Sequence, residues 1–314
     1  MGMYKLNPAC KDYLWGGKRL IEEYGIQYDG GICAEAWVLS CHKDGQSKIA
    51  SDIEKSKSLA ELVRSNKAIL GTNCDRFEDF PILIKLIDAK KKLSIQVHPD
   101  DEYAIKNENQ YGKTEMWYVL EAKEGSYLYL GFEKEIDKEE FIERIANNTL
   151  TDVLHKQYVK RGDVIFISPG TVHAIGEGIV VAEIQQNSNI TYRIYDYGRV
   201  GADGKPRELN IEKALDVIKL KRPADYSRSD EHLALCDYFC VDKVEITEGN
   251  PFLKRAGADS FVSILVISGC CTVSSGSETI IMKKGDSLFV EANTGEFKVE
   301  GNAELILTSI PQKE

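Results

Sequence analysis

The sequence predicts a mainly β protein, folded as a sandwich or a barrel, with a few short helices. Short apolar runs separated by turn residues recur along most of the 314 residues, and runs at this spacing are typical of strands in such folds. Helical periodicity is confined to three segments, and one β pattern occurs twice. The predicted strands are Ile82–Leu86, Leu93–Val97, Met116–Leu120, Tyr127–Leu130, Val164–Ile167, Ile179–Ile184, Phe261–Ile267 and Glu304–Thr308.

Three segments have the periodicity of amphipathic helices. Asp137 is a predicted N-cap, with Glu140 three residues later, as in a capping box. Asn210 is the predicted N-cap of a second helix, and a third spans Leu59–Asn66. The apolar face of the first helix comprises Phe141, Ile142 and Ile145.

The repeated β pattern indicates two related units in tandem. Residues 161–167, Arg-Gly-Asp-Val-Ile-Phe-Ile, resemble residues 284–290, Lys-Gly-Asp-Ser-Leu-Phe-Val. In each copy a Gly-Asp pair, which suits a tight turn, leads into an apolar strand. Each copy also follows an apolar, hairpin-like stretch, so we predict a duplicated β unit.

The two units are predicted to differ in their metal chemistry. When the copies are superimposed at their offset, His173 of the first falls on Glu296 of the second, and no histidine follows His232. We therefore predict a metal-binding catalytic domain with helical inserts at residues 1–225, and a C-terminal β domain without a metal site at residues 226–314.

Composition and charge exclude several classes of function. The formal net charge of −10 is a poor match for a nucleic-acid binder or a polybasic membrane-surface protein. Residues 1–15 have no apolar core of a signal peptide, and no run approaches the roughly 18 apolar residues of a membrane span. We expect a cytoplasmic protein without nucleic-acid or membrane partners. The acidic net charge does not exclude a small anionic substrate, because a few converging Lys and Arg side chains can bind one phosphate. The oligomeric state is left open.

The eight cysteines are interpreted as reduced thiols that pack in the interior. Cys236 and Cys240 could be half of a thiolate metal site, but no second pair with suitable spacing accompanies them. His42, His155 and His232 lie in no comparable setting, so we expect surface or structural roles for them.

Polar side chains alternate along the strand that ends at Pro99. Ser94, Gln96 and His98 are two residues apart, so their side chains point to the same face of the strand. Apolar residues occupy the positions between them. This pattern is typical of a strand that lines a polar cavity.

Two further residues complete a candidate metal site with His98. Glu115 stands at the entrance of an apolar strand, where an uncompensated carboxylate would be costly. His173 follows a Pro-Gly turn directly after another strand. Two imidazoles and a carboxylate, with an amide oxygen from Gln96 as an option, suit zinc, and iron or manganese could use the same atoms.

Several motifs resemble those of type I phosphomannose isomerases, in their short bacterial form. The resemblance runs in order from about residue 10 to 220, and the total length fits the short form. The motifs are Tyr-Leu-Trp-Gly-Gly at 13–17, Ala-Glu-Ala-Trp at 34–37, Gln-Val-His-Pro-Asp at 96–100, Lys-Thr-Glu-Met-Trp at 113–117, Pro-Gly-Thr-Val-His-Ala at 169–174 and Tyr-Arg-Ile-Tyr-Asp-Tyr-Gly-Arg at 192–199.

The resemblance implies a cupin fold, a double-stranded β-helix barrel, followed by a cupin-like C-terminal unit without metal. It implies an isomerase that interconverts mannose 6-phosphate and fructose 6-phosphate through an enediol. Matched motif by motif, Gln96, His98, Glu115 and His173 would hold one zinc ion per chain. The Gln96 amide could instead hydrogen-bond a bound water.

The resemblance also assigns roles around the metal. Arg193 matches an active-site position, and its permanent charge suits an enediolate or a phosphate rather than proton transfer. Lys113 and Glu183 are the candidate acid–base residues, and which of them transfers the proton is left open. Lys85 and Ser94 match positions near the substrate phosphate. Without the resemblance, Lys85 could be a solvated lysine and Glu183 the partner of an arginine.

The sequence departs from the long-form enzymes at three positions. Gly112 and Thr114 stand where those enzymes carry histidine and proline, and Asn189 stands where they tend to carry an acidic residue. A mechanism that needs those side chains cannot operate unchanged here. Two other functions are considered: a metal-dependent cupin oxygenase, typically with iron and more histidines, and a non-catalytic sugar-binding cupin.

Overall fold

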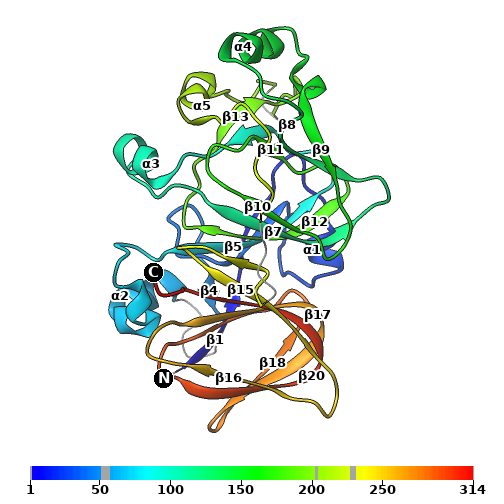
Figure 1. Cartoon of the computed structure of the whole chain (residues 1–314). Coiled ribbons are helices and arrows are strands. Elements are labelled where there is room, and N and C mark those ends of the chain that lie inside the picture. The colour runs from blue at the N-terminus through cyan, green and yellow to red at the C-terminus, as the bar shows by residue number, and fades with distance from the viewer. Residues whose placement is uncertain (1, 51–56, 202–203, 227–230, 314) are drawn as a thin grey trace. The chain divides into compact units, whose positions relative to one another are not determined.

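The structure, a computed structural model, describes residues 2–50, 57–201, 204–226 and 231–313 and is mainly β (Figure 1). Each of the predicted strands overlaps a strand of the structure, although the one predicted at Leu93–Val97 begins only at Ile95, and the predicted fold class is confirmed. Within the described residues no helix is both long and apolar enough to cross a membrane.

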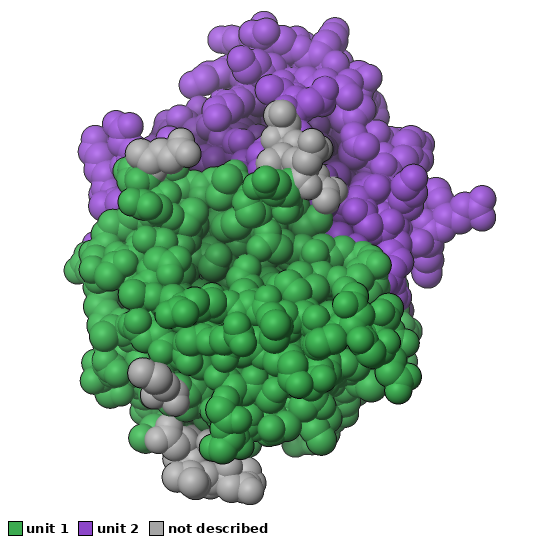
Figure 2. All heavy atoms as spheres, turned by 60° about the horizontal axis from the view of Figure 1, so that its bottom comes forward, with its two compact units in different colours: residues 1–12, 18–86, 228–314 green, residues 13–17, 87–227 purple. Residues whose placement is uncertain are grey.

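The chain forms two compact units, which Figure 2 colours separately. Unit 1 comprises residues 1–12, 18–86 and 228–314, and unit 2 comprises residues 13–17 and 87–227. The N-terminal segments therefore group with the C-terminal residues. The division into domains at residues 225 and 226 stays a prediction.

Unit 1 is built on a nine-stranded antiparallel sheet. Strands β14, β15, β20, β17, β19, β1 and β4 follow one another in the sheet, while β16 pairs with β20 and β18 with β17. The inward residues of these strands form one apolar core, which includes Val262, Ile264 and Leu305. The strands are β1 (Met3–Asn7), β2 (Ala9–Lys11), β3 (Glu35–Leu39), β4 (Lys48–Ile49), β14 (Ala234–Leu235), β15 (Cys240–Ile246), β16 (Phe252–Ala256), β17 (Val262–Ser275), β18 (Glu278–Lys283), β19 (Ser287–Val290) and β20 (Gly295–Ser309), with β5 (Ile82–Ala89) running from unit 1 into unit 2.

Unit 2 contains two antiparallel strand arrays. One has the order β13-β6-β11-β8-β9, and in the other β7 pairs with both β10 and β12. Ile95 and Val97 of β6 face an apolar core, so Gln96 between them points to the other face. The strands are β6 (Ile95–Val97), β7 (Glu115–Ala122), β8 (Tyr127–Phe132), β9 (Leu154–Tyr158), β10 (Val164–Ile167), β11 (His173–Ala174), β12 (Ile179–Gln186) and β13 (Tyr192–Tyr195).

The helices are short, and three of them lie in unit 2 beside the five-stranded array (Figure 1). The prediction of a capped helix at Asp137 is confirmed, since the Asp137 carboxylate accepts a hydrogen bond from the Glu140 amide at 2.7 Å. Phe141 is buried in the core, whereas Ile142 is half exposed. The helices are α1 (Arg19–Glu22), α2 (Leu59–Ser65), α3 (Asp101–Glu108), α4 (Lys138–Ala146) and α5 (Ile211–Val217), with 3-10 turns at Lys67–Leu70, Thr72–Cys74 and Leu150–Asp152.

Two details of the helices differ from the prediction. Helix α3 has a weak apolar periodicity and was not predicted. Asn210 does precede α5, but its side chain does not cap that helix. The Asn210 side-chain oxygen Oδ1 instead accepts a hydrogen bond from the Arg193 backbone amide at 3.1 Å.

The repeated Gly-Asp pattern forms the same turn in both units. Gly162 and Gly285 have φ values of +90° and +91°, in the region that glycine occupies without the steric cost of a Cβ. The Asp163 carboxylate accepts a hydrogen bond from the amide three residues before it at 2.8 Å, and Asp286 does the same at 2.7 Å. The predicted β repeat is therefore present as a shared local structure.

Helix α2 contains none of the candidate site residues, so its cap tests local stability alone. Ser58 and Glu61 form a reciprocal capping box at its start. We expect Ser58→Ala to lower the free energy of unfolding by about 1 kcal/mol, because one helix amide loses its acceptor. Urea denaturation measures this change, with Ser65→Ala in the last turn as the control. Equal effects of the two substitutions would contradict the capping role.

Candidate metal centre and active site

Three buried side chains of unit 2 converge on one point. His98 Nε2 lies 3.1 Å from His173 Nε2. Glu115 Oε1 lies 3.7 Å from His98 Nε2 and 3.2 Å from His173 Nε2. His98 follows β6, His173 begins β11 and Glu115 begins β7, so the two strand arrays meet at this cluster. The structure thus brings the three predicted ligands together.

These separations fit a single metal ion. Ligand atoms held about 2.0–2.2 Å from a tetrahedral zinc lie about 3.3–3.6 Å from one another. The three observed separations, 3.1, 3.2 and 3.7 Å, are close to that range. Because the donors are two imidazole nitrogens and a carboxylate oxygen, the chemistry of the set also suits a divalent transition metal.

His173 is held in the form that a metal ligand requires. Its Nδ1 lies 2.9 Å from the Thr171 carbonyl oxygen, so Nδ1 carries the proton and donates it. Nε2 is then left with its lone pair directed at the cluster, as is usual for metal-bound histidines. Burial lowers the pKa of His173 to about 4, so the ring is neutral at pH 7.

Gln96 occupies a fourth position next to the cluster. Its amide nitrogen lies 3.3 Å from His173 Nε2, a separation equal to the edge of a tetrahedral site. The two ends of an amide exchange by a simple rotation of the group, which would turn the oxygen toward the same point. Gln96 can therefore serve as a ligand or as a hydrogen-bond partner of a bound water.

Lys113 lies against the cluster. Its Nζ is 3.1 Å from His98 Nε2 and 3.0 Å from Glu115 Oε2, and the side chain is buried. A side chain at the preceding residue is excluded, since a Cβ on Gly112 would lie 2.4 Å from the Asp100 carbonyl carbon. The close approach of this backbone gives a physical reason for the glycine.

Glu183 and Trp117 form a buried pair beside Lys113. The Trp117 indole donates a hydrogen bond to Glu183 Oε2 at 2.8 Å, and Glu183 Oε1 lies 4.0 Å from Lys113 Nζ. The Trp117 ring also meets the His173 ring edge-on, with centroids 5.5 Å apart. Trp117 was not among the predicted site residues. Its signal was its position two residues after Glu115, which places both side chains on one face of β7.

Arg193 lies at the other side of Gln96. Strand β6 pairs with β13 and β11 so that Gln96 stands opposite both Arg193 and His173, and residues directly opposite in a sheet share a face. The guanidinium donates from Nε to Ser94 Oγ at 3.2 Å and from one terminal nitrogen to the Glu208 carbonyl at 3.1 Å. Burial lowers the pKa of Arg193, with Arg207 adding to the effect.

Lys85 belongs to unit 1 and has its own buried surroundings there. Its Nζ lies 3.7 Å from Glu35 Oε2 and 5.2 Å from the centroid of the Trp37 ring. Trp37 donates to the same Glu35 oxygen at 2.7 Å. Because Lys85 is buried, the alternative interpretation of this residue as a solvated lysine is wrong.

Asp196 orders the segment after Arg193. Burial alone would raise the pKa of Asp196, but hydrogen bonds from Arg207 and Arg199 lower it. Arg207 donates to this carboxylate from Nε at 2.8 Å and from a terminal nitrogen at 2.6 Å. Arg199 and Arg207 therefore both bind the Asp196 carboxylate, which links these three residues of the segment after β13.

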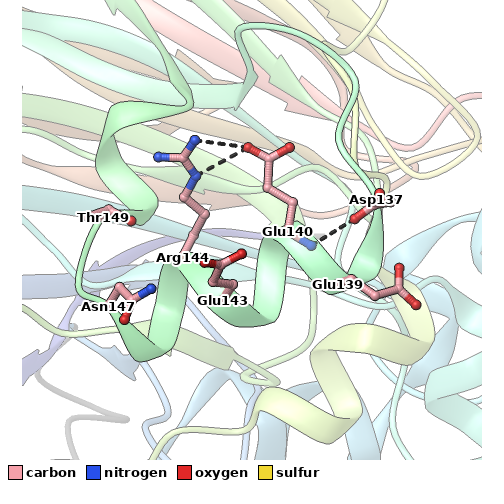
Figure 3. A pocket seen from close by; sticks show the side chains of 7 residues that line it. All are labelled: Asp137, Glu139, Glu140, Glu143, Arg144, Asn147 and Thr149. Carbon is pink, nitrogen blue, oxygen red and sulfur yellow. Dashed lines mark hydrogen bonds and ion pairs between the residues drawn. The ribbon is translucent and has the colours of Figure 1, made fainter.

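The remaining histidines and the cavity on α4 lie outside this cluster. His42 contacts Asp44, His155 contacts Glu133, and His232 contacts Asp242. A cavity of about 570 Å³ lies on the surface of α4, where Arg144 binds Glu140 and the other side chains are mostly acidic (Figure 3). None of the predicted site residues lines it.

Known families match both parts of the chain. A family profile described as the catalytic domain of type I phosphomannose isomerase matches residues 3–127. A second profile, described as the cupin domain of mannose-6-phosphate isomerase, matches residues 229–310. The predicted cupin fold is confirmed by this match and by the structural similarity that follows.

Two relatives match nearly the full length. The mannose-6-phosphate isomerase ManA of Bacillus subtilis is 37% identical over 96% of this chain and 97% of its own. The mannose-6-phosphate isomerase of Streptococcus mutans is 35% identical, with 93% of each chain covered. The crystal structure of the mannose 6-phosphate isomerase from Bacillus subtilis superimposes with a TM-score of 0.90 and 32% identity, over 98% of this chain and 99% of that one. With similarity of this level over nearly all of its length, the chain belongs to the family of type I mannose-6-phosphate isomerases.

Proposed function

We propose that this protein is a zinc-dependent isomerase that interconverts mannose 6-phosphate and fructose 6-phosphate at the cluster of His98, Glu115 and His173. The observation that carries the proposal is the convergence of these three ligand atoms at separations near those of a tetrahedral metal site. Bound zinc would supply positive charge beside the sugar oxygens, as a Lewis acid.

The side chains around the cluster suit an aldose–ketose isomerisation. The reaction moves a proton between C2 and C1 and passes through an enediol whose oxygens gain negative charge. Lys113 and Glu183, with Nζ and Oε1 4.0 Å apart, are the two groups proposed to hold that proton. Arg193 remains charged throughout and is proposed to stabilise the developing charge or the phosphate.

The proposed substrate contacts extend to Ser94 and Lys85. Ser94 accepts a hydrogen bond from Arg193 at 3.2 Å, which supports a shared role toward an anionic group. The ammonium of Lys85 is buried against Glu35 and Trp37, and an ordered cation of this kind suits phosphate recognition. We keep both residues as the proposed phosphate contacts.

We also propose a cytoplasmic enzyme that acts on a small molecule, without nucleic-acid or membrane partners. The net charge of −10 supports this assignment. All eight cysteines are free thiols, which is the usual state in a reducing compartment.

Removal of the metal is the first test. Exhaustive chelation is expected to abolish the conversion of mannose 6-phosphate to fructose 6-phosphate, and added zinc to restore it, because the charge beside the sugar oxygens is lost and regained. His98→Ala is expected to lower both bound zinc and turnover, and His155→Ala neither. Elemental analysis and an isomerase assay on the same samples measure this. Full activity after chelation would refute the metal role.

Arg193 tests the enzymatic role against a purely sugar-binding one. Arg193→Ala is expected to lower kcat/KM by roughly 100-fold or more, since a preorganised charge facing the substrate is lost. Bound zinc and the folded state should not change, because the guanidinium contacts Ser94 and Glu208 rather than a metal ligand. Arg144→Ala on α4 is the matched control. Unaltered turnover would exclude Arg193 from the active site.

A pair of substitutions identifies the proton-transferring group. Glu183→Gln keeps an acceptor for the Trp117 indole but removes the carboxylate, and Lys113→Met removes the ammonium. If Glu183 carries the proton, Glu183→Gln should lower kcat by roughly 100-fold or more with little change in KM. Lys113→Met should then retain measurably more turnover than Glu183→Gln. The reverse order would assign the proton to Lys113.

A further inference from the structure

A second cluster of ligand side chains lies in the C-terminal part of unit 1. It comprises His232, which precedes β14, and Cys240 and Asp242, alternate residues of β15 that share a face. One ligand atom from each lies within 4.8 Å of the other two. We infer that these three side chains form a second metal site, which takes a zinc-like divalent cation. The inference is independent of the proposed isomerase activity, and it revises the expectation that this part of the chain holds no metal.

The geometry favours a metal over a catalytic triad. His232 Nδ1 lies 2.5 Å from Asp242 Oδ1 and 3.4 Å from Cys240 Sγ. Both partners therefore approach the same ring nitrogen, whereas a thiol–imidazole–carboxylate triad uses the two ring nitrogens separately. The three donor atoms lie within 4.8 Å of one another, close enough for one cation to contact all of them after a small adjustment.

The separations need only a small adjustment to accept zinc. In a tetrahedral site a nitrogen and a sulfur ligand lie about 3.6 Å apart, and a nitrogen and an oxygen ligand about 3.3 Å. The 3.4 Å between Cys240 and His232 is near the first value. The 2.5 Å between His232 and Asp242 is that of a hydrogen bond. A cation that replaces the shared proton would move these two side chains apart by less than about 1 Å.

The chemical types of the three donors indicate which ion the site would bind, and their exposure allows that ion to enter. A thiolate, an imidazole and a carboxylate together select zinc, or its substitutes cobalt and cadmium, over magnesium and calcium, which prefer oxygen ligands alone. The His232 and Asp242 side chains are 27% and 22% exposed. A hydrated ion can therefore reach them, and a water can complete the coordination.

Lys254 provides a specific control. Its Nζ lies 3.4 Å from Asp242 Oδ2, so its charge competes with a cation for the same carboxylate. Lys254→Met is therefore expected to strengthen metal binding, whereas Asp242→Asn is expected to weaken it. If Lys254 and Asp242 formed only a structural ion pair, the two substitutions would not change metal affinity in opposite directions.

Cobalt absorption distinguishes this site from the proposed active centre. That centre has no sulfur ligand, so it gives no charge-transfer band between sulfur and cobalt, and substitution of Cys240 separates the second site from the other free thiols. We would add cobalt to reduced His98→Ala protein and follow the band. The expected result is saturation with one equivalent, loss in Cys240→Ser, and retention in Cys236→Ser. Circular dichroism verifies folding, and if His98→Ala does not fold, the native chain with excess cobalt shows the same band.

Quantitative titration completes the test. We expect Asp242→Asn to weaken cobalt binding, and Lys254→Met to strengthen it, each by about tenfold. The absence of a sulfur–cobalt band in folded protein would overturn the proposal. So would an unchanged band in Cys240→Ser, or a band that appears only at millimolar cobalt. Isomerase activity is not part of the readout, so a failure of the proposed function would not affect this result.

Discussion

The register of β6 with its two neighbours is the constraint on which the proposed active site depends. Gln96 stands opposite Arg193 on β13 and opposite His173 on β11. A permanent cation, an amide and an imidazole of the proposed metal site are thereby set in one row on one face of the array. A slip of one residue would turn each of them to the apolar face. Since Ile95 and Val97 fill the core on that face, hydrophobic packing holds the register.

The second array, which contains β7 and β12, supplies the carboxylates of the site, and its strand register also sets their positions. Glu115 and Trp117 share a face of β7, and Trp117 stands opposite Glu183 on β12. The buried carboxylates are thus delivered from one array and the imidazoles from the other. Desolvated charges of this kind are stable only when they compensate one another or a bound cation. Lys113 contacts both Glu115 and Glu183, but one ammonium offsets only one of the two carboxylates. A cation bound at the proposed site would balance the other.

Local sequence patterns predicted the parts of the site that local geometry determines. Alternation along one strand places Ser94 and Gln96 on one face, and a Pro-Gly turn before His173 marks a residue at the start of a strand. Pairing between distant strands has no local signature, so the contacts of Trp117 with Glu183 were not predicted. Helix α3 was missed because its apolar periodicity is weak. The grouping of the N-terminal segments with the C-terminal residues was also not predicted, because it depends on pairing between strands that are distant in the sequence, such as β1 and β19.

The glycine before Lys113 couples two segments of the chain. The space that a side chain at position 112 would need is filled by the backbone of Asp100 and Asp101. A residue with a Cβ therefore cannot enter position 112 by one substitution. It requires a simultaneous displacement of the chain where α3 begins, so residue 112 and that backbone can change only together.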